Sequence, residues 1–349
     1  MTARATRTPP DYGLRRLTVE LTNVCNLHCS YCLRDEDALY HAPANFLPVD
    51  LFARIAAQAR DAMAIEHIMF TGGEPTLHRQ FADIVAAVGQ LSLTCSFVTN
   101  GWHFDRVWPL LSAHRDTVTH VSFSLDGTTA AAHDGWRGKG SFERVVRAFS
   151  RCWAAGFPFN VKVGIRRDTA AHLEQFALLA ARMGAAGLSF AHVMPTSSAV
   201  ADASALTLEE RADAEREIAL LARIFRMRIG IDVGYYNVSH ESPCSALNGV
   251  SANVDYRGQL SLCCNLSGFR GGAGAADVAG DLTVEPFGAA LERLRGIAAG
   301  QSERRRRALT VLEASGATAD LATGAPCLFC LNTLGKTPWS GDGAGKATG

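Results

Sequence analysis

The sequence predicts an α/β fold, a partial (β/α)6 TIM-like barrel followed by a small C-terminal domain built from a β-hairpin and helices. Two observations predict it. Apolar strand-like segments alternate with helical patterns over the first 200 residues, and after Pro195 a small, polar stretch leads into a second region with its own cysteines. With 349 residues, of which 48% are hydrophobic, the chain can bury a full core.

The expected elements alternate along the chain. Strands are predicted at residues 17–21, 67–70, 94–99, 120–125, 159–165 and 188–192. Helices are predicted between them, at residues 48–62, 79–91, 108–113, 142–155 and 170–183. Such an order implies a parallel sheet with right-handed crossovers. Because ligands of these folds bind at the carboxyl ends of the strands, we expect a functional site on that rim.

Three cysteines follow the first strand with the spacing C-x3-C-x2-C, namely Cys25, Cys29 and Cys32. Thiolates on one tight loop can bind three irons of a [4Fe-4S] cluster and leave the fourth iron without a protein ligand. Structural zinc and coincidence are the alternatives, but zinc sites usually add a second C-x2-C pair, and the nearest further cysteine is Cys95. A disulfide framework is disfavoured, because residues 1–10 contain no apolar signal segment.

With Tyr31 in the aromatic position, this loop resembles the C-x3-C-x-aromatic-C signature of the radical S-adenosylmethionine (SAM) superfamily. The resemblance covers residues 14–335 and includes four further segments, which are Thr71-Gly72-Gly73-Glu74-Pro75, Val98-Thr99-Asn100-Gly101, residues 121–127 and residues 133–142. It implies that a reduced cluster cleaves bound SAM to methionine and a 5'-deoxyadenosyl radical, which takes a hydrogen atom from the substrate.

The glycine segment has a physical reason for its residue types. Gly72 and Gly73 allow a sharp turn and a close approach to a ligand, and Glu74 places a carboxylate beside that backbone. The resemblance implies that this segment contacts the methionine amino group of SAM and that Tyr31 lies along the adenine.

Further candidates for the SAM site stand at or beyond strand ends. Asn100 follows the third strand, and we assign Ser124 and Asp126, which close the fourth, to the ribose or the methionine carboxylate. The alternative for the latter pair is a plain Asp-Gly turn. Arg137 could bind the methionine carboxylate with two parallel hydrogen bonds, unless it is a solvated loop arginine, and Arg166 is a rival for this role.

The C-terminal region has a second cysteine set. Cys244, Gly258 and Cys263 follow C-x13-G-x4-C around a predicted hairpin, and Cys327 and Cys330 add C-x2-C. This pattern resembles the auxiliary-cluster extension called SPASM, or its shortened form, twitch, which is favoured because the middle cysteine run is missing. The resemblance implies a second [4Fe-4S] cluster bound by these four cysteines and used for electron transfer. A four-cysteine zinc ribbon is the alternative, and Cys264 could replace Cys263.

We therefore divide the chain into five parts, which are an N-terminal tail (1–13), the barrel core (14–200), a linker helix (201–234), the auxiliary iron-sulfur domain (235–335) and a disordered tail (336–349). Tyr235, Tyr236 and His240 precede Cys244 and could line a substrate cavity or supply an acid-base group, although packing is the commoner role of such residues.

Charge balance and cysteine content limit the expected partners and the expected compartment. The chain has 34 basic and 34 acidic residues, so no nucleic-acid or membrane partner is expected, and ten cysteines without a targeting segment indicate the cytoplasm. We expect a radical SAM oxidoreductase that performs a two-electron oxidation, such as a dehydrogenation or crosslink, in a biosynthetic pathway. The expected partners are a small-molecule or externally presented peptide substrate and a flavodoxin- or ferredoxin-type electron donor.

Several other outcomes stay open at this point. The same core could serve a redox-neutral epimerase, lyase or decarboxylase, or a peptide maturase. A non-enzymatic iron-sulfur redox sensor is the alternative from a different class, which the Gly-Gly-Glu segment and the strand-end Ser124 and Asp126 disfavour.

Overall fold

The computed structural model describes residues 15–34, 42–196, 204–241, 244–267, 269, 274 and 276–337. Within these residues the strands form one sheet in the order β10-β9-β8-β1-β2-β3-β4-β5-β6-β7. The strands are β1 (Arg16–Glu20), β2 (His67–Thr71), β3 (Thr94–Thr99), β4 (Val118–Ser124), β5 (Phe159–Ile165), β6 (Gly187–His192), β7 (Arg228–Val233), β8 (Ser251–Val254), β9 (Gln259–Ser261) and β10 (Val278–Asp281). All neighbouring pairs from β8 to β7 are parallel, whereas β9 pairs antiparallel with β8 and with β10.

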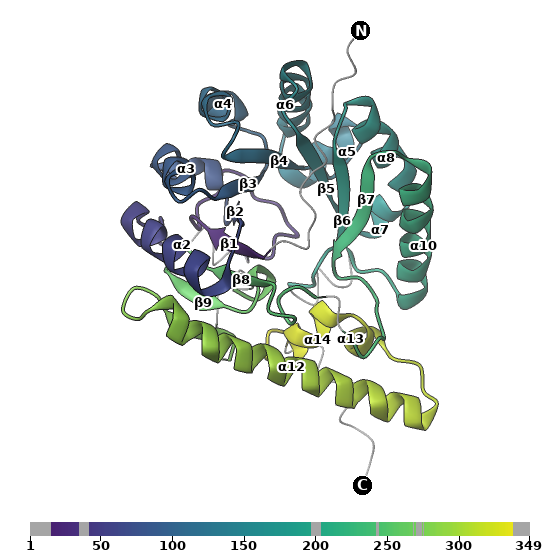
Figure 1. Ribbon diagram of the computed structural model, residues 1–349. Coiled ribbons are helices and arrows are strands. Elements are labelled where there is room, and N and C mark those ends of the chain that lie inside the picture. The colour runs from purple at the N-terminus through teal and green to yellow at the C-terminus, as the bar shows by residue number, and fades with distance from the viewer. Residues whose placement is uncertain are drawn as a thin grey trace.

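Helices cover the outer face of the curved sheet, as Figure 1 shows. The helices of the first 224 residues are α2 (Val49–Met63), α3 (Phe81–Gln90), α4 (Phe104–Ala113), α5 (Ala130–Arg137), α6 (Ser141–Ala155), α7 (Arg167–Ala170), α8 (Leu173–Arg182) and α10 (Leu208–Ile224), with a 3-10 turn, η1 (Pro75–Leu77). The C-terminal helices are α11 (Cys264–Ser267), α12 (Phe287–Ser315), α13 (Leu321–Gly324) and α14 (Pro326–Thr333), and α12, α13 and α14 lie beneath the β8–β9 end of the sheet. Among the described residues, no helix combines the length and apolarity needed to cross a membrane.

Strand alternation places the core between the sheet and its helices. In β5, Val161 and Val163 are buried on the helix-covered face, while Asn160 and Lys162 point to the opposite, inner face. The helices are amphipathic in the same sense, so that Phe149 of α6 stacks on Phe159 with ring centroids 5.1 Å apart. We call the inner face of the sheet the lumen.

The α/β fold and its barrel-like parallel sheet confirm the predicted fold class. Each of the six predicted strands forms, and the helix predicted at 170–183 is interrupted, because α7 ends at Ala170 and α8 begins at Leu173. The expected linker helix forms as α10, but it is followed by β7, a strand that we did not predict, which pairs with β6.

The C-terminal hairpin also joins the barrel. Strands β8 and β9 flank the Arg257-Gly258 turn as predicted, and β8 pairs with β1 in parallel, with Leu17 opposite Ala252. The hairpin therefore extends the core sheet, because the free edge of β1 offers backbone hydrogen-bonding groups that need partners. Helix α12 then runs beneath this end of the sheet and packs against α2 (Figure 1).

Candidate functional site

The cysteine loop is held against the loop that follows β2. The Gly73 N–H donates to the Thr22 carbonyl at 2.7 Å, and the Glu74 N–H donates to the Val24 carbonyl at 2.8 Å. A Cβ atom on Gly73 would lie 2.1 Å from the Val24 carbonyl oxygen, so only glycine fits. Gly72 adopts a φ of +131°, which side chains rarely tolerate. The close approach that we expected toward a ligand is made here to the segment leading into Cys25.

The Glu74 carboxylate is buried and points into the protein. One oxygen, Oε1, accepts from the Thr76 hydroxyl at 2.6 Å, the Thr99 hydroxyl at 2.8 Å and the Thr76 N–H at 3.2 Å. The other, Oε2, accepts from the Asn100 N–H at 2.8 Å. Burial raises the pKa of Glu74, and these hydrogen bonds oppose the rise. Glu74 thus joins the ends of β2 and β3, and ligand contacts from this loop would come from its backbone.

Asn100 lies beside the first cysteine. Its Nδ2 donates to the Asn26 Oδ1 at 3.0 Å and lies 4.0 Å from the Cys25 Sγ. All three loop cysteines are partly exposed. Burial raises the pKa of Cys25 to about 12, and the Cys32 and Cys29 thiols, which are close enough to interact, add to the effect.

The donor set fits a cluster site. It offers three free thiols on one partly exposed loop, and the Cys32 N–H donates to the Cys29 carbonyl at 3.0 Å to hold that loop turned. Within the described ranges, no three His, Cys, Asp or Glu side chains are grouped so that they could hold one metal ion. A cluster does not require such a group, since each thiolate ligates a different iron.

Tyr31 of the cysteine loop belongs to a network of charged side chains centred on Asp126. The Asp126 carboxylate, which is fully buried, pairs with Arg137 and with Arg166, whose Nη1 lies 3.0 Å away. The Tyr31 hydroxyl donates to the same carboxylate and accepts from the Arg137 Nη2 at 2.8 Å. Both arginine candidates for the methionine carboxylate are therefore engaged by Asp126 in this structure.

The network also stacks rings on charges. The Arg166 guanidinium lies 4.8 Å from the Tyr31 ring centroid and 4.1 Å from that of Trp136. Although burial alone would raise the pKa of Asp126, the two guanidinium groups and the Tyr31 hydroxyl lower it to about 2. Tyr31, Asp126, Arg137 and Arg166 thus form one connected wall at the carboxyl ends of β4 and β5. Ser124 lies at the end of β4, in register with Lys162 of β5.

The auxiliary cysteines gather near one another. The Gly234 N–H donates to the Cys327 Sγ at 3.4 Å, and the Asn265 N–H donates to the Cys263 Sγ at 3.5 Å. Burial raises the pKa of Cys330 to about 12, with further contributions from the neighbouring Cys244 and Cys327 thiols.

Cys263 and Cys264 differ in their surroundings. A hydrogen bond to Cys264 and then burial raise the pKa of Cys263, and the Cys244 and Cys327 thiols add to the effect. The pKa of Cys264 is lowered by the same hydrogen bond, and its other charged neighbours are Glu20, Arg16 and Lys162. Cys263 thus lies beside Cys244 and Cys327, whereas Cys264 lies between Cys327 and the charged groups of the barrel.

A buried acidic group between the two cysteine sets was missed from the sequence. Glu20, the last residue of β1, is fully buried and pairs with Arg34, two residues after Cys32. Glu20 also accepts from Ser267 of α11 and, at 3.3 Å, from the Asn253 amide of β8. The sequence does contain a sign of this group, because Glu20 is the one acidic residue in the apolar segment 17–21, and a buried carboxylate requires a buried partner.

Two of the three candidates before Cys244, Tyr236 and His240, make polar contacts with the C-terminal helical region. The Tyr236 hydroxyl donates to the Ala319 carbonyl at 2.8 Å, and the His240 Nε2 lies 2.9 Å from the Glu313 Oε1. Tyr235 lies beside the auxiliary cysteines, where burial and the Cys244 thiol raise its pKa.

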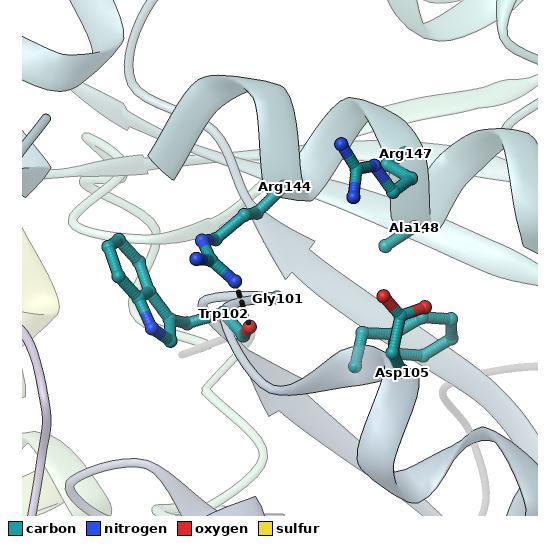
Figure 2. Close-up of a pocket in the computed structure, with 7 residues that line it drawn as sticks. Gly101, Trp102, Asp105, Arg144, Arg147 and Ala148 are labelled. Carbon is teal, nitrogen blue, oxygen red and sulfur yellow. Dashed lines mark hydrogen bonds between the residues drawn. The ribbon is translucent and has the colours of Figure 1, made fainter. Parts of the chain in front are cut away.

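A surface pocket behind the end of β3 is separate from this site. Figure 2 shows it between Trp102 and Asp105 on one side and Arg144 and Arg147 on the other. The Arg144 guanidinium stacks 4.3 Å from the Trp102 ring centroid. Apart from Gly101, which follows Asn100, its lining includes no residue of the segments that form the cysteine site.

Comparisons with known proteins agree with this geometry. The chain is 35% identical over 175 residues to "Mycofactocin maturase MftC" of Mycobacterium tuberculosis, which covers 48% of this chain and 42% of that protein. It is 30% identical over 161 residues to "GTP 3',8-cyclase" of Synechocystis sp., covering 45% and 48%. The matched part thus spans less than half the length of these curated relatives.

Solved structures share the fold over a longer stretch. Streptococcus suis SuiB bound to its precursor peptide SuiA superposes with a TM-score of 0.64 at 12% identity, over 82% of this chain and 67% of that one. The structure of anSMEcpe with bound AdoMet gives a TM-score of 0.65 at 17% identity, over 84% and 85%. Residues 19–180 match the family model described as "Radical SAM superfamily". This match covers a little under half of the chain, and it makes residues 19–180, which include the cysteine loop at the sheet rim, similar to the radical SAM superfamily.

Proposed function

We propose that the protein is a radical SAM enzyme that takes a hydrogen atom from an organic substrate and completes a two-electron oxidation with the help of an auxiliary cluster. The observation that carries the proposal is the position of Cys25, Cys29 and Cys32. They lie on one loop at the carboxyl ends of the parallel strands, pinned by glycines that no other residue could replace.

The residues of the chain have distinct roles in this proposal. Cys25, Cys29 and Cys32 would bind the first [4Fe-4S] cluster, which supplies the electron that cleaves SAM to a 5'-deoxyadenosyl radical. Backbone groups of Gly72 and Gly73 and the Asn100 amide would contact the methionine part of SAM. The wall formed by Tyr31, Asp126, Arg137 and Arg166 would shape the adenosine side, with Ser124 at its edge.

The auxiliary site would bind a second [4Fe-4S] cluster through Cys244, Cys263, Cys327 and Cys330. Support comes from the mutual proximity of these thiols and from the backbone N–H groups directed at two of them. Four protein ligands leave no iron open, which suits electron transfer from a substrate radical. A flavodoxin- or ferredoxin-type protein would supply the electron for the first cluster.

Peptide maturation is the second candidate. The observation that favours it is the name "maturase" of a relative that is 35% identical over 175 residues. The fold alone does not choose between substrates, since the matched region is shared with a protein named as a GTP cyclase.

Product analysis tests the proposal. The anaerobically reconstituted protein, given SAM and dithionite, should form 5'-deoxyadenosine and hold roughly eight irons per chain. About four irons plus one zinc would identify a zinc ribbon at the auxiliary site. A redox sensor would hold its irons and form no 5'-deoxyadenosine, and that result would overturn the enzymatic proposal.

A further inference from the structure

The lumen contains an ion pair where parallel barrels usually have bulky apolar side chains. The Lys162 ammonium of β5 pairs with the Asp232 carboxylate of β7. Ser189, on the strand between them, donates its hydroxyl to the same Asp232 oxygen at 3.2 Å. Three adjacent strands therefore present a cation, a hydroxyl and an anion to the inner face, and Figure 1 shows β5, β6 and β7 side by side.

Stability does not explain this pair. The Lys162 and Asp232 side chains are 27% and 34% exposed, and an ion pair so open to water contributes only about 0–1 kcal/mol. The same exposure makes both charged groups reachable by a ligand. A charge pair that adds little to folding and faces an internal space is a candidate for binding.

The pair also lies between the two cysteine regions. Lys162 of β5 is in register with Ser124 of β4, two residues before Asp126, so it lies about 7 Å below the Tyr31 wall along the strands. Asp232 precedes Gly234, whose N–H contacts the Cys327 Sγ.

We propose that Lys162 and Asp232 bind the α-amino-acid group of a small-molecule substrate, with its carboxylate on Lys162 and its ammonium on Asp232. This inference rests on the proposed function and names its substrate class. Ser189, and Ser124 in register with Lys162, would add hydroxyl contacts at the two ends of the group.

Charge balance selects a zwitterion over other ligands. A zwitterion exchanges one internal ion pair for two pairs with the ligand, so no charge is left uncompensated. A simple anion would take Lys162 and leave Asp232 without its cation, and a simple cation would do the reverse, at the cost of an unpaired, partly desolvated charge. Affinity should therefore depend on both groups of the ligand and on both residues of the pair.

Equilibrium dialysis of the anaerobically reconstituted protein with SAM, without reductant, tests this. The probe is a set of the twenty L-α-amino acids, with the N-acetyl and amide derivatives of each amino acid that binds. We expect at least one to bind with a Kd below about 1 mM, and both Lys162→Met and Asp232→Asn to weaken it by about tenfold or more, or ~1.4 kcal/mol. Both derivatives should bind as weakly as the amino acid binds to these variants.

Two controls keep the test independent of folding. Arg182→Met removes an exposed cation at the end of α8, outside the lumen and the motif segments, and should leave binding unchanged. The double variant Lys162→Asp with Asp232→Lys keeps an internal ion pair, and it should retain more affinity for a zwitterion than either single variant. Circular dichroism and thermal unfolding should show that all the variants are folded.

Several results would overturn the inference. They are the absence of millimolar binding in the wild type, binding that depends on Lys162 alone, and equal binding of the N-acetyl or amide derivatives. Formation of 5'-deoxyadenosine by the wild-type protein with no amino acid added is a separate measurement. If it fails while binding holds, the proposed function is wrong and the binding site remains.

Discussion

Replacing Asp126 by asparagine should be among the most damaging single changes in the barrel. The carboxylate is fully buried and receives Arg137, Arg166 and the Tyr31 hydroxyl. Asparagine keeps the volume and one acceptor oxygen but removes the charge. Two guanidinium groups then lie buried without their shared anion, although Arg166 keeps a contact with Asp168 at 3.1 Å.

The magnitude follows from the pKa of Asp126. It falls from an ordinary 3.8 to about 2, and at 1.36 kcal/mol per pKa unit the ionised form is favoured by about 2.4 kcal/mol over the neutral form. Because folding lowers the pKa, this contribution is present above about pH 4 and is lost as the pH falls through about 2. An unpaired buried charge usually costs about 3–5 kcal/mol. We therefore expect Asp126→Asn to lower the free energy of unfolding at pH 7 by about 2.4 to 5 kcal/mol.

Urea titration of wild type and variant, followed by tryptophan fluorescence, measures the loss directly. Trp136, stacked on Arg166, reports on the site itself. A change in the free energy of unfolding below about 1 kcal/mol would refute the reasoning, because a shared anion that holds two buried arginines must cost more than an exposed ion pair to remove.

Three further predictions concern the two cysteine regions. Gly73→Ala forces a Cβ atom into neighbouring backbone, so it should lower the free energy of unfolding by about 3 kcal/mol and release iron from the first site. The control Gly135→Ala, where a Cβ atom has no neighbour within 4 Å, should be neutral or stabilise α5 by up to about 1 kcal/mol. Urea midpoints and iron counts compare the two variants, and equal effects would contradict the packing argument. Cys263→Ala should remove about four irons per chain and Cys264→Ala none, so that the reverse result in an iron assay would reassign the ligand. Glu20→Gln leaves a buried arginine without its anion and should lower the free energy of unfolding by about 3–5 kcal/mol in a urea titration, and a loss under 1 kcal/mol would exclude a structural role for the charge.

Alternation and spacing predicted much of the fold. The six core strands could be read because each is a short apolar run bounded by turns, and the motif residues could be placed on one rim because parallel strands end together. Strand β7 (Arg228–Val233) was not predicted, because it follows a helix that we interpreted as a linker. Only its pairing with β6 makes it part of the sheet. The pairing of β8 with β1 links residues more than 200 positions apart, which no local pattern contains.

The sequence predicted which residues belong to the site better than it predicted the contacts among them. Spacing grouped the cysteines, but it could not show that Glu74 is enclosed by Thr76, Thr99 and the Asn100 N–H, because those contacts depend on how three loops meet. The pairing of both candidate arginines with Asp126 depends on tertiary structure in the same way. Lys162 was within reach of sequence reasoning, since a lysine alternating with buried valines must face the lumen.

The most direct test of the central claim compares two cysteine variants. Cys29→Ala removes one of the three thiols of the first loop, and Cys95→Ala removes a fully buried thiol of β3 as a matched control. After anaerobic reconstitution, with SAM and dithionite, the account predicts 5'-deoxyadenosine from wild type and Cys95→Ala and none from Cys29→Ala. Formation of 5'-deoxyadenosine by Cys29→Ala at the wild-type rate would contradict the assignment of this loop as the site of SAM cleavage.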